Sequence, residues 1–248
     1  MYAMITSMKT TEYIRNGIDR MPRGQVFRFA ELVDDVARTG AVIKFLNRLV
    51  GAGRLEKLSK GRFYKPQEGV FGRSVPDQYQ VVKDLLEKNG RIIGYLTGYS
   101  VYGKLGLTTQ VSNSIQIGRN DIRSLFRRGI YTISFVRQKN AITKEVIPLL
   151  QILDAIRLIK KIPDAGIVSV CRRLLAIVQE LRPQDLVSIA DLALRYPPAT
   201  RALLGAILDQ LGNTSISQAL RSSLNPVSTY CIPGCDTVMS TASIWNIV

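Results

Sequence analysis

The order of short apolar segments in the first 68 residues is the feature of this sequence that most constrains its fold. Apolar residues at helical spacing follow Thr11, which can cap a helix, until Pro22 and Gly24 end it. An extended piece is predicted over residues 25–27, and a second helix over residues 29–36. The chain is therefore expected to begin with two helices separated by a short strand.

A third helix is predicted from about Thr39 to about Val50, where the following glycines supply a left-handed helix end. Two short runs, residues 55–58 and 62–65, come next, and Ser59-Lys60-Gly61 joins them as a hairpin signal. Helix, strand, two helices and a hairpin is the plan of a winged helix-turn-helix. Such a unit presents one helix to the major groove of DNA.

The third helix has a polar stripe opposite its apolar one, formed by Lys44, Asn47 and Arg48. Arginine and lysine can donate to guanine, and asparagine can pair with adenine. The predicted hairpin adds Lys57, Lys60 and Arg62. We expect these six residues to bind DNA. Two other interpretations stay open, because basic helix faces are often only solvated and winged helices also serve as protein–protein modules.

The net charge also favours a polyanionic partner. The chain has 34 Lys and Arg against 19 Asp and Glu, a formal net charge of +15. Divided at the Pro- and Gly-rich stretches near 66–76 and 163–166, residues 1–68 carry +6, residues 69–165 carry +8 and residues 166–248 carry +1. The first two segments are therefore the ones expected to contact a polyanion.

The residue inventory argues against catalysis. There is no histidine, which removes histidine-based acid–base and nucleophilic catalysis and all histidine-containing metal sites. Three cysteines are too few for a disulfide framework, and no clustered carboxylates could seat two metal ions. We expect no enzyme activity, no metal and no cofactor. Without a signal peptide or a membrane span, a cytoplasmic protein is expected.

The second segment opens with a helix predicted over residues 78–88 and an extended run over residues 91–96. The stretch Gly98 to Lys104 then satisfies the first half of a phosphate-loop motif. Position 105 is Leu, where that motif needs Ser or Thr for magnesium, so nucleotide binding is disfavoured. Residues 99–105 are predicted instead to be a helix that ends at Gly106.

Strands are predicted over residues 114–117 and 130–136. Between them, Asn120-Asp121 can cap a short helix that carries Arg123, Arg127 and Arg128. These arginines are candidate contacts for phosphate or an acidic partner surface, with a solvated helix end as the alternative. A strongly apolar helix is predicted over residues 148–161.

The predicted fold class is α+β, with an N-terminal winged helix-turn-helix, a mixed α/β middle domain and an appended C-terminal helical region. The domain bounds are 1–68, 77–165 and 166–224. Four helices are expected in the last of these, over residues 168–181, 184–194, 200–211 and 215–224. Residues 225–248 are rich in Ser and Thr, and we expect a poorly ordered tail there.

Several short motifs occur in an order that resembles a known family. They are Val42 to Val50, Gly53-Arg54-Leu55, Lys60 to Tyr64, Gly98-Tyr99-Ser100 and Leu105-Gly106-Leu107-Thr108-Thr109-Gln110-Val111. Together with the helix after Pro148, they resemble AbiEi-type antitoxins of bacterial type IV toxin–antitoxin systems, which act in abortive infection. The resemblance covers about residues 8–165.

The resemblance implies a function in two parts. The winged helix of such an antitoxin represses its own operon by binding operator DNA, and Lys44, Asn47, Arg48, Lys60 and Arg62 match the reading positions. The C-terminal domain counteracts a nucleotidyltransferase-like toxin, without a stable complex being expected. The alternative is a winged-helix transcriptional regulator with no toxin partner, whose middle domain dimerises or binds an effector. An enzyme acting on nucleic acid is the third and least favoured interpretation.

Overall fold

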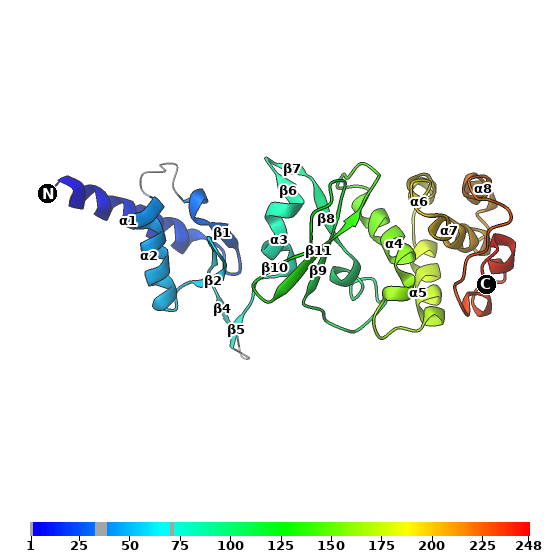
Figure 1. Cartoon of the computed structure of the whole chain (residues 1–248), viewed down its shortest axis with the longest axis horizontal. Coiled ribbons are helices and arrows are strands. Elements are labelled where there is room, and N and C mark those ends of the chain that lie inside the picture. The colour runs from blue at the N-terminus through cyan, green and yellow to red at the C-terminus, as the bar shows by residue number, and fades with distance from the viewer. Residues whose placement is uncertain (1, 33–38, 70–71) are drawn as a thin grey trace. The chain divides into compact units, whose positions relative to one another are not determined.

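The computed structural model describes residues 2–32, 39–69 and 72–248. It has a mixed α+β fold, as the sequence predicts, and divides into two compact units (Figure 1). The first unit is Met1–Lys83 with Arg127–Ile130, and the second is Asp84–Phe126 with Tyr131–Val248. None of the described helices combines the length and the apolar character that crossing a lipid bilayer requires.

The first unit combines helices with a small antiparallel sheet. Its elements are α1 (Tyr2–Arg20), β1 (Val26–Arg28), the 3-10 helix η1 (Phe29–Glu31), α2 (Thr39–Gly51), β2 (Glu56–Ser59) and β3 (Arg62–Tyr64). The strand order is β1-β3-β2, with Phe27 opposite Phe63. The extended piece at residues 25–27, the third helix and the hairpin are therefore confirmed.

Two details of this unit differ from the sequence analysis. α1 begins at Tyr2 rather than near Thr11, because residues 2–10 contain neither Gly nor Pro to stop the helix. Of the helix predicted over residues 29–36, the structure shows the short 3-10 helix η1 at Phe29–Glu31. Residues 33–36 of the prediction lie outside the described residues.

The apolar stripes of α1 and α2 share one core with the sheet. The buried side chains come from all of these elements and are Ile14, Ile18, Phe27, Leu32, Val42, Phe45, Leu46, Leu49, Leu55 and Phe63. The ring centroids of Phe27 and Phe63 lie 6.2 Å apart across the strand pair. Because the apolar residues of α2 point into this core, its polar stripe is left on the outside.

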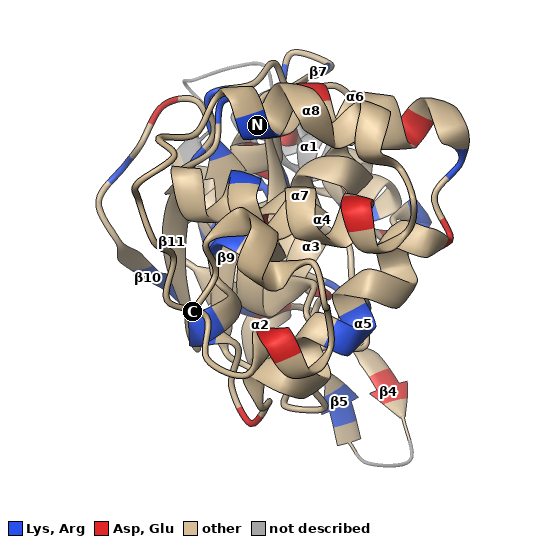
Figure 2. Ribbon diagram, turned by 90° about the vertical axis from the view of Figure 1, so that its right-hand side faces the viewer, with Lys and Arg blue, Asp and Glu red and all other residues tan. Residues whose placement is uncertain are grey.

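A second hairpin and a helix follow along the chain. Strands β4 (Gln67–Gly69) and β5 (Gly72–Ser74) pair Glu68 with Arg73, visible in Figure 2 as an acidic band on one strand and a basic band on the other. α3 (Gln78–Leu86) follows, and the carboxylate of Asp77 accepts a hydrogen bond from the backbone N–H of Gln80 at 2.9 Å. This contact is an N-terminal cap.

α3 ends two residues before the predicted end of that helix, because a tight turn follows it. Asn89 and Gly90 have φ angles of 51° and 73°, the conformation of a two-residue hairpin turn. The turn pairs β6 (Glu87–Lys88) with β7 (Arg91–Ile92). Asn-Gly is the strongest short hairpin signal, and here it prevails over the helical periodicity.

A four-stranded sheet is built on the two predicted strands. Its strand order is β10-β11-β9-β8, for β8 (Gly94–Thr97), β9 (Ser114–Arg119), β10 (Phe126–Arg128) and β11 (Tyr131–Arg137). β9 and β11 are parallel, and β8 is antiparallel to β9. α4 (Ile147–Arg157) packs against β8, and a 3-10 helix at Ile159–Lys161 extends it, close to the predicted range of 148–161.

The helix predicted over residues 99–105 does not form. Gly98 to Ser100 is a 3-10 turn, and a succession of further turns leads to Gly106. Gly98 has a φ of +55°, and a Cβ there would lie 1.8 Å from Oε1 of Gln116. The glycine that suggested a phosphate loop is therefore explained by a close approach of Gln116 to the backbone.

Four helices follow, close to their predicted ranges: α5 (Ile167–Gln179), α6 (Pro183–Ala193), α7 (Pro198–Gln210) and α8 (Thr214–Ser222). Pro183 and Pro198 are the first helical residues of α6 and α7, a position that suits proline because no N–H is lost. One core cluster contains buried residues from Tyr95 to Ile247. The predicted boundary at residue 166 therefore does not separate two cores.

The expectation of a poorly ordered tail at residues 225–248 is wrong. Two short 3-10 helices, Cys235–Thr237 and Ala242–Trp245, lie in this segment, and a bridge pairs Tyr230 with Ile247. Met239 and Trp245 are 0% and 2% exposed. The Ser- and Thr-rich composition predicted disorder, but the segment also contains a few widely spaced apolar residues, whose burial stabilises it.

Candidate nucleic-acid interface

The outer face of α2 carries the three side chains that the sequence analysis assigned to base reading. Lys44, Asn47 and Arg48 are all exposed, at i, i+3 and i+4 of one helix. The guanidinium carbon of Arg48 lies 5.2 Å from the ring centroid of Phe45, a cation–π contact that restrains the end of this long side chain. We call these three residues the α2 stripe.

The β2–β3 hairpin carries the other three predicted contacts. Lys57 and Lys60 are exposed, and Arg62 is half-buried. Gly61 has a φ of +72° at the turn, which glycine adopts without strain. Lys57 points to solvent while Leu58, the next residue, is buried, so the hairpin keeps its cations outside and its apolar residues inside.

The neighbouring basic residues differ from this surface because they lie close to carboxylates. Arg54 forms an ion pair with Asp19 at 2.8 Å, and Arg73 faces Glu56 at 3.5 Å. In the part of the chain that the structure describes, Lys44, Arg48, Lys57 and Lys60 form no ion pair. Their charges are not neutralised by nearby carboxylates, which leaves them available to phosphate.

The arginines at 123, 127 and 128 do not share a helix face. Residues 122–125 have no regular structure, and Phe126–Arg128 forms β10 instead of the predicted helix. Arg123 is exposed at 3.8 Å from Asp121, and Arg127 is exposed. Arg128 is 5% exposed and donates to the backbone carbonyl of Val81 at 2.6 Å, so it holds α3 and is not an accessible contact.

The predicted helix cap at Asn120-Asp121 is used differently. Asp121 accepts two hydrogen bonds from the buried Arg119, at 2.8 and 2.9 Å. The Asn120 side chain donates to the carbonyls of Gln138 and Asn140, both at 2.8 Å. With both side chains engaged elsewhere, neither caps a helix at this point.

A buried polar network lies in the second unit, between β8 and α4. The carboxylate of Asp154 accepts hydrogen bonds from Tyr95 at 2.7 Å, Thr97 at 2.8 Å and Tyr196 at 3.0 Å. The Gln138 side chain donates to both tyrosine hydroxyls. Burial raises the pKa of Asp154, although these three hydroxyl donors act in the opposite direction. Asp154 is 0% exposed, so the network is structural.

A group of basic residues surrounds a pocket of this unit, and the sequence alone did not predict it. They come from separate segments and are Arg137, Lys139, Arg157, Arg195 and Arg201. Their side chains belong to the end of β11, to α4, to the α6–α7 linker and to α7. Sequence periodicity cannot relate residues that lie this far apart in the chain, so the positive net charge was the one sequence feature that pointed to such a group.

Comparison with known proteins places the chain in a family. A model described as a family of unknown function, DUF6088, matches residues 13–186, which is more than half of the chain. The chain belongs to this family. In this DUF6088 member the matched range includes the α2 stripe, the β2–β3 hairpin and the whole four-stranded sheet.

No curated protein matches the chain. A crystal structure of the RV2827C protein from Mycobacterium tuberculosis is similar to this DUF6088 member, with a TM-score of 0.48 and 15% sequence identity. The similarity covers 90% of this chain and 84% of the other.

Proposed function

We propose that the protein is the antitoxin of a type IV toxin–antitoxin system. Its first unit acts as a winged helix-turn-helix that binds operator DNA and represses its own operon. Its second unit counteracts a nucleotidyltransferase-like toxin. The DNA-binding half is supported by geometry in the first unit, and the toxin-directed half by the resemblance of about residues 8–165 to AbiEi-type antitoxins.

One observation carries the DNA-binding half. An exposed stripe of Lys44, Asn47 and Arg48 lies on the helix that directly precedes a basic hairpin, in a unit with strand order β1-β3-β2. A helix that buries one side and presents donors on the other is what major-groove reading requires. Lys44, Arg48, Lys57 and Lys60 form no ion pair among the residues that the structure describes, and they add the electrostatic part of the affinity.

Three single variants test the assignment in mobility-shift titrations with operator and random DNA. Arg48→Ala should weaken operator binding by about 1–3 kcal/mol more than random binding, because a base contact is lost. Lys60→Ala should weaken both alike and lower the salt slope by about 1, because a phosphate contact is lost. Arg15→Ala, at an exposed position of α1, is the matched control and should change neither. Equal losses on both DNAs for Arg48→Ala would refute base reading.

The toxin-directed half needs a separate experiment. The full chain is co-expressed with the nucleotidyltransferase-like toxin from the same operon, and growth is measured. We expect rescue by wild type and by Arg48→Ala, since operator binding and antitoxicity reside in different units. Failure of the wild-type chain to restore growth would contradict the antitoxin assignment.

A second candidate function is a winged-helix regulator without a toxin partner, whose second unit binds an effector. The basic pocket of that unit favours it. The gene neighbourhood separates the two candidates, because an antitoxin requires a toxin gene in the same operon. In the effector-binding case, operator affinity should change when the pocket is filled.

A further inference from the structure

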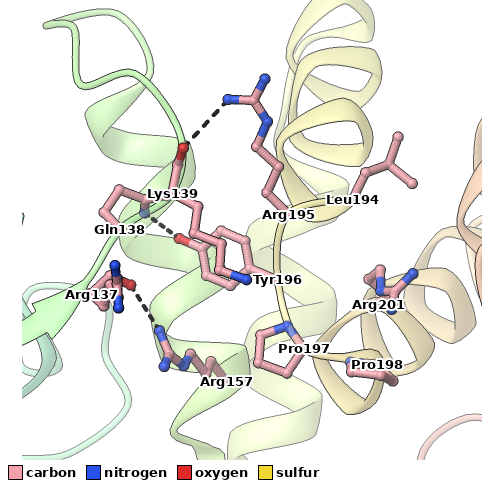
Figure 3. Close-up of a pocket in the computed structure, with 10 residues that line it drawn as sticks. All are labelled: Arg137, Gln138, Lys139, Arg157, Leu194, Arg195, Tyr196, Pro197, Pro198 and Arg201. Atoms are coloured by element: carbon pink, nitrogen blue, oxygen red, sulfur yellow. Dashed lines mark hydrogen bonds between the residues drawn. The ribbon is translucent and has the colours of Figure 1, made fainter. Parts of the chain in front are cut away.

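A pocket of about 380 Å³ opens in the second unit between the end of β11, α4 and the α6–α7 linker (Figure 3). Its volume lies within the range of about 300–1,000 Å³ that is usual for small-molecule sites. Gln138 and Tyr196 line it and are 3% and 6% exposed, so they form a firm floor. Their mutual hydrogen bond of 2.7 Å connects the floor to the buried Asp154 network.

The charge of the pocket is entirely of one sign. None of its ten lining residues is acidic, and half of them are cationic: Arg137, Lys139, Arg157, Arg195 and Arg201. Within residues 2–32, 39–69 and 72–248, none of the five forms an ion pair with a carboxylate. Asp154 lies beneath the floor, is 0% exposed and has its oxygens occupied by three hydroxyl donors. Arg157 interacts electrostatically with this buried carboxylate. Cations gathered around one pocket repel one another, and a bound anion relieves that repulsion.

Backbone carbonyls hold the arginines in place and leave most of their donors free. Arg157 donates to the carbonyl of Arg137 at 3.1 Å, and Arg195 donates to that of Lys139 at 3.4 Å, both drawn in Figure 3. Arg201 donates to the carbonyl of Ser223 at 2.7 Å, while its Nε is buried with no partner among the described residues. A guanidinium has five N–H donors in a planar fork, and this fork matches the oxygens of phosphate.

We propose that this pocket binds a compact phosphorylated small molecule with two or more phosphate groups. The five cations line one concavity and come from four segments of the chain, which suits adjacent phosphates in a small ligand. A DNA duplex instead presents its phosphates along an extended backbone and is met by charges spread over a face. Inorganic pyrophosphate and the phosphates of a nucleotide share the required chemistry.

Isothermal titration of the full chain with pyrophosphate, at constant ionic strength, tests the proposal. We expect saturable binding at one site, weakened about tenfold or more in Lys139→Gln and in Arg195→Gln, because each removes a charged donor. Arg172→Gln, at an exposed arginine of α5 that does not line the pocket, is the matched control and should bind as wild type does. Thermal unfolding of each variant checks its fold.

Adenosine triphosphate and inorganic triphosphate, titrated in parallel, separate the two ligand sources. Tighter binding of the nucleotide identifies a nucleotide site, and equal binding identifies recognition of the phosphates themselves; both support the proposal. Absence of saturation by every one of these probes, or an equal loss in Arg172→Gln, would overturn it. So would variants at 139 and 195 that lose affinity for duplex DNA alone. Arg48→Ala should retain pyrophosphate binding, so this test fails or succeeds independently of operator binding.

Discussion

Gly205→Ala tests how the C-terminal segment is anchored. Gly205 lies in α7 directly beneath the indole of Trp245, and a Cβ at this position would lie 2.2 Å from Cη2 of that ring. The indole cannot move freely, because its N–H donates to the carboxylate of Asp209 at 2.8 Å and the ring is 2% exposed. The added methyl group must therefore displace either the helix or the ring.

Opposing contributions set the size of the effect. Alanine in place of glycine inside a helix stabilises by about 1 kcal/mol. Overpacking a tight core costs about 1–3 kcal/mol, and the short contact at Trp245 places this site at the upper end. We expect the free energy of unfolding to fall by about 2 kcal/mol, and the melting temperature by about 4–8 °C for a protein of this size.

Intrinsic fluorescence measures this directly, because Trp245 is the single tryptophan of the chain. Urea titration of Gly205→Ala should give a lower midpoint, with native emission shifted to the red as the indole becomes more exposed. The matched control is Gly17→Ala in α1, where a Cβ meets nothing within 4 Å, so emission should stay unchanged. Wild-type emission together with equal or higher stability in Gly205→Ala would refute the packing of Trp245 on α7.

Three further predictions concern the second unit. Burial raises the pKa of Asp154 above 3.8, so the native state binds more protons than the unfolded state and the free energy of unfolding should fall as the pH rises from about 4 toward the native pKa. Asp154→Asn should flatten that slope in urea titrations at several pH values, and an unchanged slope would rule out this role. Gly118→Ala places a Cβ 2.3 Å from the Tyr95 ring and should cost about 1–3 kcal/mol in the same assay, whereas wild-type stability would contradict the close contact. A thiol reagent should label one cysteine in the native protein, with mass spectrometry identifying Cys231 because the other two thiols are buried; rapid labelling of all three would contradict that burial.

The elements predicted correctly are those specified by local signals. α2 was predictable because its apolar residues repeat at helical spacing and glycine follows it, and the β2–β3 hairpin because a polar turn with Gly61 separates two short runs. The α2 stripe follows from the same periodicity, because the residues between the apolar positions of a helix lie on its exposed face. Local signals thus determine both the helix and the side chains it presents.

The elements predicted wrongly depend on contacts between distant residues. Gly98 allows Gln116 to approach the backbone, and the buried Arg128 donates a hydrogen bond to a backbone carbonyl of α3. Trp245 anchors a segment whose composition resembles a disordered tail. The basic pocket has the same origin, because its cations come from segments that are adjacent only in the fold.

We propose that the α2 stripe and the β2–β3 hairpin form a specific DNA-binding surface. The most direct test is a mobility-shift titration of the wild-type protein with its own upstream DNA and with random DNA of equal length, at 50 and 200 mM salt. We expect preferential binding of the upstream DNA, with affinity falling about a thousandfold between the two salt concentrations for six phosphate contacts. Equal affinity for both DNAs, or no binding at either salt concentration, would contradict the claim.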